Sequence, residues 1–209
     1  MQTPLSIGNN LGAPRVLLRL ANLPNIITFV RILLIPVLVV LLTSPSPLAS
    51  VLATVTFFLA CLSDFLDGYL ARRWGLSTTL GKLLDPLADK LIVAAALIML
   101  AGMERMPSVP SWMVVVIIGR EIAVTGLRAV ALGQGVVLAA EELGKYKMIF
   151  QMFALHGLLL HYHFVGVDFH VAGMYFLWIS LVISLWSGID YHVRGIRQLT
   201  QGTLGESCS

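Results

Sequence analysis

Long apolar stretches separated by short polar segments dominate the pattern of hydrophobic and polar positions along the chain. Each stretch is close to the roughly 20 residues that a helix needs to cross the hydrocarbon core of a bilayer. Six such windows can be centred on residues 26–43, 49–71, 84–103, 111–132, 147–165 and 171–191. The pattern therefore predicts an all-α integral membrane protein with six transmembrane helices.

The amino-acid composition also indicates a membrane protein. Of the 209 residues, 57% are hydrophobic and 12% are charged, a balance that soluble domains of this size do not normally show. Most Lys and Arg residues fall at one set of helix ends, which should be cytoplasmic, and an even number of spans puts both termini there. The N-terminus has neither a signal-peptide nor a transit-peptide pattern, so a bacterial inner membrane is the simplest location.

The ends of the chain lie outside the predicted membrane domain, residues 22–197. Within residues 1–21, arginines alternate with Leu and Val at helical spacing in "PRVLLRLA", which predicts a short amphipathic helix on the cytoplasmic membrane surface. Residues 198–209 are rich in Gly, Ser and Thr and should be disordered. The basic charges form no stripe with interleaved aromatic residues, so we expect membrane lipid and anionic substrates as partners, and no nucleic acid.

Four aspartates interrupt the apolar pattern around the predicted cytoplasmic loop 73–81, between the second and third spans. Asp64 and Asp67 are three residues apart and share a helix face, and Asp85 and Asp89 are four apart at the start of the next span. The short loop between the two pairs favours antiparallel neighbouring helices. An ionised carboxylate within a membrane costs roughly 2.5–3.5 kcal/mol on insertion scales, so these aspartates need cationic partners.

Two kinds of cation could compensate the negative charges of these aspartates. Basic side chains such as Arg72, Lys82 and Lys90 could form ion pairs that only hold helices together. However, a ligand set of oxygen atoms alone, without histidine or paired cysteine, suits a hard divalent ion such as Mg²⁺ or Mn²⁺. Two ions could share the four carboxylates, an arrangement common in phosphoryl transfer.

Small residues at fixed spacing complete a longer pattern, D-x2-D-G-x2-A-R-x8-G-x3-D-x3-D. The positions that match it are Asp64, Asp67, Gly68, Ala71, Arg72, Gly81, Asp85 and Asp89. The pattern resembles the signature of the CDP-alcohol phosphotransferase family at every defined position. Upstream, "NLPNIITFVR" places Asn25, Thr28 and Arg31 on one helix face and resembles the family's N-x2-T-x2-R stretch, although Asn25 read alone would be a helix cap after Pro24.

The resemblance implies a homodimeric membrane enzyme that transfers a phosphoryl-linked group from a CDP-alcohol to a second alcohol and releases CMP. It implies that Asp64, Asp67 and Asp85 bind the metal, and that Asp89, also beside the metal, is the general base for the acceptor hydroxyl. The residues that it assigns to the donor nucleotide are Asn25, Thr28, Gly68, Ala71, Arg72 and Gly81.

Further basic residues indicate a second anion site. Arg120 and Arg128 in "GREIAVTGLR" are eight residues apart, about 80° around a helix and about 12 Å along it. Arg120 lies inside an apolar run and must face a polar partner or cavity. Its pairing with Glu121 should be poor, because neighbours in sequence point apart. Lys145 and Lys147 lie at the same cytoplasmic level, although positive-inside anchoring would also explain them.

These shorter motifs bear on the acceptor. "REI", "LR" and "GKYK" resemble the branch of the family that forms phosphatidylglycerophosphate, with Met148 where related enzymes often have a small hydroxyl residue. This resemblance implies CDP-diacylglycerol as donor and glycerol 3-phosphate as acceptor, with Arg31, Arg120, Arg128, Lys145 and Lys147 around the acceptor phosphate. Another acceptor (inositol phosphate, serine or a phosphatidyl lipid) stays open, as does a transporter in which intramembrane Asp and Arg line a pathway.

One structural alternative stays open as well. Proline disfavours a helical conformation for the residue before it, so the third span either starts near Asp85 or bends at Pro86.

Overall fold

The computed structural model describes residues 23–74, 79–103, 107–136, 138, 142–164 and 166–206. Within these ranges, the side chains of residues 23–27, 64–74, 79–86, 142, 164 and 201–206 are outside the description. The expected surface helix at residues 14–21 lies outside the described residues.

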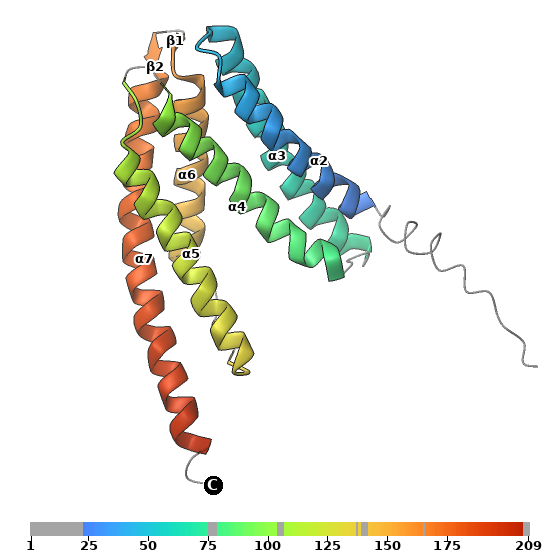
Figure 1. Ribbon diagram of the computed structural model, residues 1–209, viewed down its shortest axis with the longest axis vertical. Helices are drawn as coiled ribbons and strands as arrows, with labels where there is room; N and C mark the ends of the chain where they lie inside the picture. The colour runs from blue at the N-terminus through green and yellow to red at the C-terminus, as the bar shows by residue number, and fades with distance from the viewer. Residues whose placement is uncertain are drawn as a thin grey trace, which may run out of the picture.

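Helices account for nearly all of the described chain (Figure 1). They are α2 (Leu23–Leu42), α3 (Pro47–Trp74), α4 (Thr79–Gly102), α5 (Ser111–Gly133), α6 (Glu142–Leu160) and α7 (Phe169–Glu206). Each of the six predicted windows falls on one of these helices, so the all-α class is confirmed. In the described residues the strands are limited to β1 (His163–Phe164) and β2 (Val167–Asp168), which pair antiparallel between α6 and α7.

Local sequence explains where two of the helices begin. The Ser46 hydroxyl accepts a hydrogen bond from the Ala49 amide at 3.1 Å, and Pro47 takes the first helical position of α3. In the same way, Asp168 Oδ1 accepts a hydrogen bond from the Val171 amide at 3.0 Å at the start of α7. Both side chains satisfy amide groups that have no partner within the helix.

Three boundaries differ from those predicted from sequence. Helix α4 begins at Thr79 and continues through Pro86, which excludes a start near Asp85, although Pro86 has no backbone N–H to donate to the preceding turn. Helix α6 ends at Leu160, where the short hairpin takes over. Helix α7 continues to Glu206, past the expected start of a disordered tail at Gln198, because extending a formed helix costs much less than nucleating one.

The helices run up and down in succession, and α2 packs against both α3 and α4 (Figure 1). Helices α3 and α4 also contact each other, as the short loop suggested, although less extensively than either contacts α2. Helix α6 packs along α7, and α5 packs against α7 from another side. At the α6–α7 crossing, a Cβ built on Gly157 would lie 2.9 Å from the Cα of Gly173, so only glycine allows this approach.

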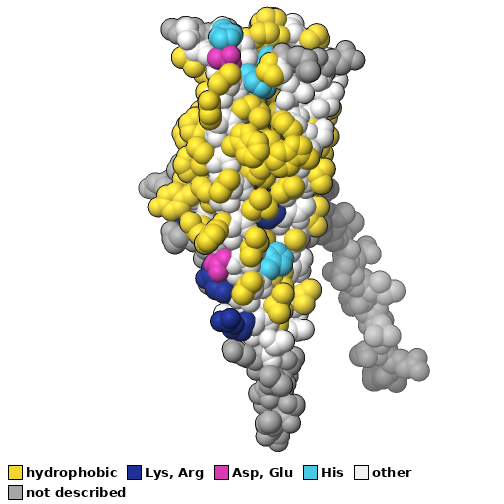
Figure 2. Space-filling view, turned by 90° about the vertical axis from the view of Figure 1, so that its left-hand side faces the viewer, with side chains coloured by type: hydrophobic (Ala, Val, Ile, Leu, Met, Phe, Trp, Pro, Cys, Tyr) yellow, Lys and Arg dark blue, Asp and Glu magenta, His cyan; other side chains and the backbone are white. Residues whose placement is uncertain are grey.

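The interior and the outer surface are both apolar. The core contains Leu38, Phe57, Ile92, Ile117, Leu155 and Leu177, all fully buried. Large hydrophobic side chains are also exposed on all six helices. Figure 2 shows a broad apolar band on one face, with Lys and Arg side chains gathered toward one end and His and acidic side chains present toward both ends.

Water-exposed proteins avoid continuous apolar surfaces of this size, whereas lipid-facing proteins require them. Among the described residues, the part of α7 from Phe169 to Thr200 is by itself long and apolar enough to cross a membrane, and Thr28–Leu42 and Pro47–Ser63 are shorter apolar stretches.

Candidate active site

The predicted acidic site lies on α3 and α4. Asp64 and Asp67 fall in the second half of α3, and Asp85 and Asp89 fall in the first half of α4. Asp89 is partly buried. The side chains of the other three aspartates lie outside the described residues, as do those of Asn25, Gly68, Ala71, Arg72 and Gly81. Their roles therefore stay predictions, and the described side chains alone contain no group of three His, Cys, Asp or Glu residues suited to a metal.

Helix α2 contributes two buried polar residues next to these helices. Thr28 and Arg31, one helical turn apart, are each 1% exposed. Arg31 Nε donates a hydrogen bond to the carbonyl oxygen of Ala60 at 3.3 Å, and Ala60 lies one turn before Asp64 on α3. The packing of α2 against both α3 and α4 thus brings its polar face to the helices that carry the aspartates.

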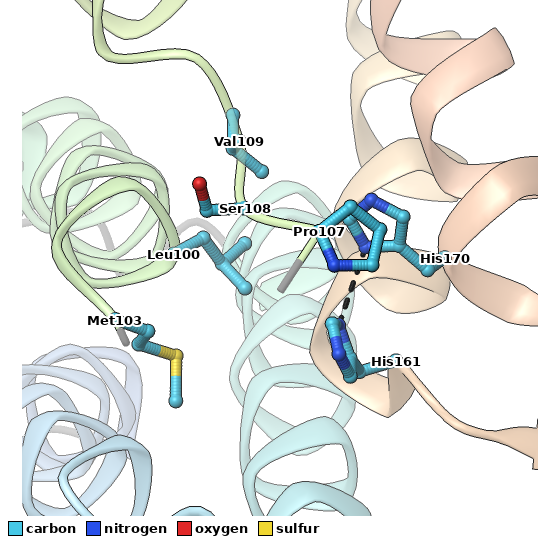
Figure 3. Close-up of a pocket in the computed structure, with 7 residues that line it drawn as sticks. All are labelled: Leu100, Met103, Pro107, Ser108, Val109, His161 and His170. Atoms are coloured by element: carbon cyan, nitrogen blue, oxygen red, sulfur yellow. Dashed lines mark hydrogen bonds between the residues drawn. The ribbon is translucent and has the colours of Figure 1, made fainter. Parts of the chain in front are cut away.

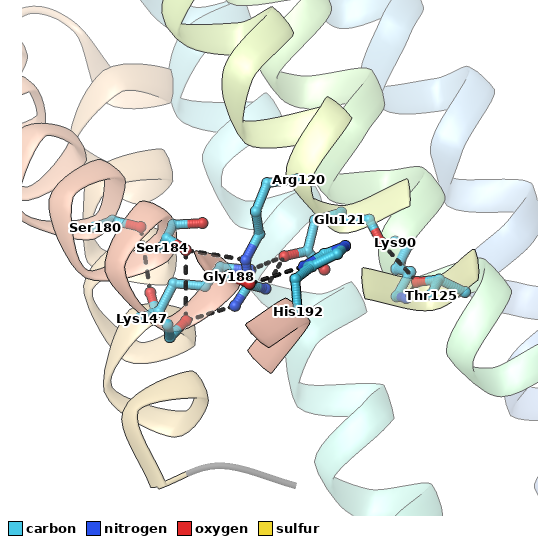
Figure 4. A network of polar contacts seen from close by, with 10 residues as sticks. Lys90, Arg120, Glu121, Thr125, Lys147, Ser180, Ser184, Gly188 and His192 are labelled. Atoms are coloured by element: carbon cyan, nitrogen blue, oxygen red, sulfur yellow. Dashed lines mark hydrogen bonds and ion pairs between the residues drawn. The ribbon is translucent and has the colours of Figure 1, made fainter. Parts of the chain in front are cut away.

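Arg120 lies in a polar cluster formed by α5, α6 and α7 (Figure 4). Its Nε donates to the carbonyl oxygen of Ser184 at 3.0 Å, and its Nη2 donates to the Ser187 hydroxyl. The expectation that this arginine within an apolar run faces polar partners is therefore confirmed. The expectation of poor pairing with Glu121 is wrong, because Arg120 Nη1 lies 2.9 Å from Glu121 Oε1. Long side chains allow adjacent residues to meet when both bend toward the same neighbouring helix.

Lys147 on α6 joins the same cluster. Its ammonium group forms an ion pair with Oε1 of Glu121, the oxygen that also accepts from Arg120. The Ser180 hydroxyl donates to the Lys147 carbonyl oxygen at 3.3 Å, which ties this part of α6 to α7. The exposed side-chain fractions are 13% for Arg120, 9% for Lys147 and 25% for Glu121. Two largely buried cations thus share one carboxylate oxygen.

A further contact links this cluster to the helix of the predicted base. Lys90, which follows Asp89 on α4, donates to the Thr125 hydroxyl on α5. The Thr125 hydroxyl in turn donates to the carbonyl oxygen of Glu121 at 2.7 Å. Asp89 and the cation cluster therefore lie on helices that are joined at this level of the bundle.

The other predicted phosphate-binding residues lie apart from this cluster. Arg128 is exposed, two turns further along α5, with its Nε 3.3 Å from the Tyr191 hydroxyl and its guanidinium 5.7 Å from the centre of the Tyr191 ring. Lys145 is exposed near the start of α6. Arg31 contacts α3, on the other side of the molecule from α7. Of the five basic residues assigned to the acceptor, the structure brings Arg120 and Lys147 together.

Sequence reasoning missed the polar stripe of α7. Ser180, Ser184 and Ser187 are spaced by four and three residues, so they share one helix face, and all three are buried against the cluster. Gly188 is also buried, and it leaves room for the Arg120 side chain. Three hydroxyl residues at helical spacing inside an apolar stretch were the sequence signal that could have revealed this face.

His161, His163 and His170 lie around the β1–β2 hairpin, at the end of the bundle opposite to the Arg120 cluster (Figures 1 and 3). His161 and His170 line a small pocket with Leu100, Met103, Pro107, Ser108 and Val109, and their Nδ1 atoms are 3.2 Å apart. His163 Nε2 lies 3.0 Å from Asp168 Oδ2. The hydrogen bond from the Val171 amide, followed by the charge of His163, holds the pKa of Asp168 below its ordinary value. His156 is different, because it lies within α6 and packs edge-on against Phe57.

Comparison with known proteins identifies the family of this chain. A family model described as CDP-alcohol phosphatidyltransferase matches residues 21–186. A Bacillus subtilis protein named CDP-diacylglycerol--glycerol-3-phosphate 3-phosphatidyltransferase is 44% identical over 183 residues, covering 81% of this chain and 93% of its own. Proteins of the same name from Rickettsia typhi (37% over 171 residues, 81% and 94%) and Haemophilus influenzae (36% over 174 residues, 81% and 91%) are also similar. The chain therefore belongs to the CDP-alcohol phosphatidyltransferase family.

Proposed function

We propose that this protein transfers the phosphatidyl group of CDP-diacylglycerol to glycerol 3-phosphate, forming phosphatidylglycerophosphate and releasing CMP. Relatives over most of the chain carry the name of this activity. The structural observation that carries the acceptor assignment is the cluster of Arg120 and Lys147, two largely buried cations on one carboxylate, on helices joined to that of Asp89. A surplus of buried positive charge is costly unless an anion binds there.

The four aspartates would supply the ligands for the metal ions. Asp64, Asp67, Asp85 and Asp89 would hold Mg²⁺ or Mn²⁺, as two ions, because hard carboxylate oxygens suit these metals. Such ions, when bound, supply positive charge against the diphosphate oxygens. Asn25, Thr28, Gly68, Ala71, Arg72 and Gly81 would bind the cytidine diphosphate portion of the donor.

The transfer itself exchanges one phosphorus–oxygen bond for another. The acceptor hydroxyl oxygen bonds to the phosphorus that carries diacylglycerol, and the bond from that phosphorus to CMP breaks, so CMP leaves with the electron pair. Asp89 would take the proton of the acceptor hydroxyl. Arg120 and Lys147, with Arg31, Arg128 and Lys145 as further predicted contributors, would hold the acceptor phosphate so that its hydroxyl faces the donor.

The chain would cross a bacterial inner membrane six times, with both termini and the active site facing the cytoplasm. Exposed apolar residues on all six helices, and Lys and Arg side chains gathered toward the end of the bundle away from the β1–β2 hairpin, support this topology. The acyl chains of the donor would then enter from the bilayer. The family resemblance supports a homodimer.

Topology can be tested with single cysteines. In a variant with Cys61 and Cys208 changed to serine, a cysteine in place of exposed His163 should react with an impermeant maleimide added outside intact spheroplasts. A cysteine in place of exposed Arg197 should react only after the membrane is opened. The reverse pattern would overturn the orientation.

The reaction is tested by CMP release from CDP-diacylglycerol by purified protein in detergent with Mg²⁺ or Mn²⁺. Glycerol 3-phosphate, serine, inositol phosphate and no acceptor are compared, and the Asp89→Asn variant and a chelator serve as controls. We expect release that depends on glycerol 3-phosphate, is lost with the chelator and returns with added metal. Asp89→Asn should lower kcat by about 10²–10⁴-fold, the usual contribution of a general base.

The alternatives give different results. Release with another acceptor would retain the reaction type and move the acceptor assignment. Absence of release with every acceptor, from folded protein supplied with metal, would overturn the proposed function.

A further inference from the structure

We propose that Glu121 is a positioning residue that holds Arg120 and Lys147 at the spacing at which they bind the acceptor phosphate. The inference rests on the proposed function, because the spacing matters only if an anionic acceptor binds these two cations. Neither the family signature nor the motifs that indicated the acceptor gave Glu121 this role.

Arg120 and Lys147 contact the same oxygen atom of Glu121. Glu121 Oε1 accepts from Arg120 on its own helix, α5, and from Lys147 on α6. Two largely buried cations on different helices repel each other strongly, because the interior screens charge poorly. A carboxylate oxygen between them converts this repulsion into two attractive contacts and fixes the distance between the cations.

Arg120 and Lys147 both keep N–H groups that can donate hydrogen bonds to a ligand. A guanidinium has five N–H groups and an ammonium has three. The hydrogen bonds described use three nitrogen atoms of Arg120, toward Glu121, Ser184 and Ser187, and one donor of Lys147. The Arg120 plane is thus fixed by α7 and by Glu121, while N–H groups of both cations stay available to phosphate oxygens.

The local charge balance fits a phosphate monoester. Arg120 and Lys147 carry two positive charges against the one negative charge of Glu121, and the exposed Lys90 is joined to the cluster through the Thr125 hydroxyl. The cluster therefore keeps a positive surplus that attracts a phosphate monoester, which carries about −1.5 to −2 at neutral pH. Glu121 therefore organises the cations without neutralising the site.

If Glu121 competed with the phosphate, its removal would change acceptor binding in the opposite direction. If Glu121 instead occupied the place of the phosphate and competed with it, removal of its charge would strengthen acceptor binding. If Glu121 positions the cations, removal of its charge lets them separate and weakens acceptor binding. The sign of the change in KM for glycerol 3-phosphate therefore decides between the two roles.

The experiment compares the unmodified protein with Glu121→Gln, Glu121→Asp and Asp190→Asn. The last variant is a matched control, because it also replaces a carboxylate paired with an arginine, but at the exposed Asp190–Arg194 pair of α7. CMP release gives kcat and KM for each substrate. The shift of the thermal unfolding midpoint on addition of glycerol 3-phosphate gives acceptor binding without turnover.

Glu121→Gln should raise KM for glycerol 3-phosphate by about 10- to 100-fold, the factor expected for loss of a charge-assisted contact, and should reduce the thermal shift. KM for CDP-diacylglycerol should change by less than about twofold, since the loss affects one substrate only. Glu121→Asp keeps the charge, but its shorter side chain places the carboxylate oxygens further from Arg120 and Lys147. It should therefore raise the acceptor KM by a smaller factor. Asp190→Asn should leave both KM values unchanged.

Several outcomes would overturn the inference. An unchanged or lower acceptor KM in Glu121→Gln would do so, and equal changes in both KM values would indicate a purely structural role. If Glu121→Gln does not fold, an unchanged acceptor KM in folded Glu121→Asp has the same meaning. Failure of the proposed function looks different, because the unmodified protein would then show no release dependent on glycerol 3-phosphate.

Discussion

Arg120 on α5 lies directly against Gly188 on α7, so closely that a Cβ built on Gly188 would be 3.0 Å from both Cγ and Nε of the arginine. The contact explains how a long charged side chain fits between two packed helices. Glycine supplies the space, while the carbonyl oxygen of Ser184 and the hydroxyl of Ser187 supply hydrogen-bond acceptors one turn or less away. A small residue and two polar groups of α7 therefore determine where the guanidinium lies.

The first prediction follows from this contact. Gly188→Ala should push the Arg120 side chain off its partners and raise KM for glycerol 3-phosphate by about tenfold, equivalent to loss of about one charged hydrogen bond. The matched control is Gly126→Ala on α5, where an added Cβ would meet nothing within 4 Å. Steady-state kinetics that show the same acceptor KM in both variants would contradict the assigned position of Arg120.

A second prediction ranks the two arginines of α5. Arg120 is largely buried and hydrogen-bonded to two helices, whereas Arg128 is exposed and contacts Tyr191. Arg120→Ala should therefore raise the acceptor KM by about 100-fold, and Arg128→Ala by no more than about tenfold, because exposed charges are screened by water. Acceptor titrations at fixed donor concentration measure both values. A larger effect of Arg128 would move the phosphate site toward the end of α5.

A third prediction concerns the α6–α7 crossing. A Cβ on Gly173 would lie 2.7 Å from the backbone nitrogen of Leu158, which cannot move without displacing α6. Gly173→Ala should therefore destabilise the protein by about 1–3 kcal/mol, the usual cost of overpacking. The control is Gly144→Ala on α6, which has open space around it. Thermal unfolding in detergent compares the two, and equal midpoints would contradict the close crossing.

A fourth prediction concerns pH. The pKa of Asp168 is lowered, mainly by the hydrogen bond from the Val171 amide. A carboxyl group with a lowered pKa in the folded protein stabilises it above the ordinary pKa of about 3.9, and this stabilisation is lost as the pH falls through the folded pKa. Asp168→Ala should thus lower the unfolding midpoint at neutral pH.

The pH dependence separates charge from capping. The difference between the unmodified protein and Asp168→Ala should shrink as the pH falls below about 4, when the carboxyl group becomes protonated. Asp168→Asn keeps a side-chain oxygen for the Val171 amide, so its midpoint should lie between the other two at neutral pH. A difference that stays constant with pH would show that the charge of Asp168 contributes nothing.

The sequence alone determined the helices and the family. Helix existence followed from the lengths of the apolar runs, because a backbone in lipid must satisfy its hydrogen bonds internally. The family followed from eight residues at fixed spacing between Asp64 and Asp89, which later agreed with the family match over residues 21–186. Local spacing carries this information because residues three and four apart on a helix share a face.

The tertiary structure alone decided which helices are neighbours and which polar groups meet. The loop between α3 and α4 indicated that these helices are neighbours, but only the structure shows that α2 packs more closely against each of them and that α7 continues past the predicted tail. Most of all, helical periodicity does not predict a pairing of Arg120 with Glu121, since adjacent residues point apart on an isolated helix. Lys147 on α6 and Ser187 on α7 lie far away in sequence and draw both side chains into one cluster. Contacts between helices depend on packing and shape, which helical periodicity within one segment does not encode.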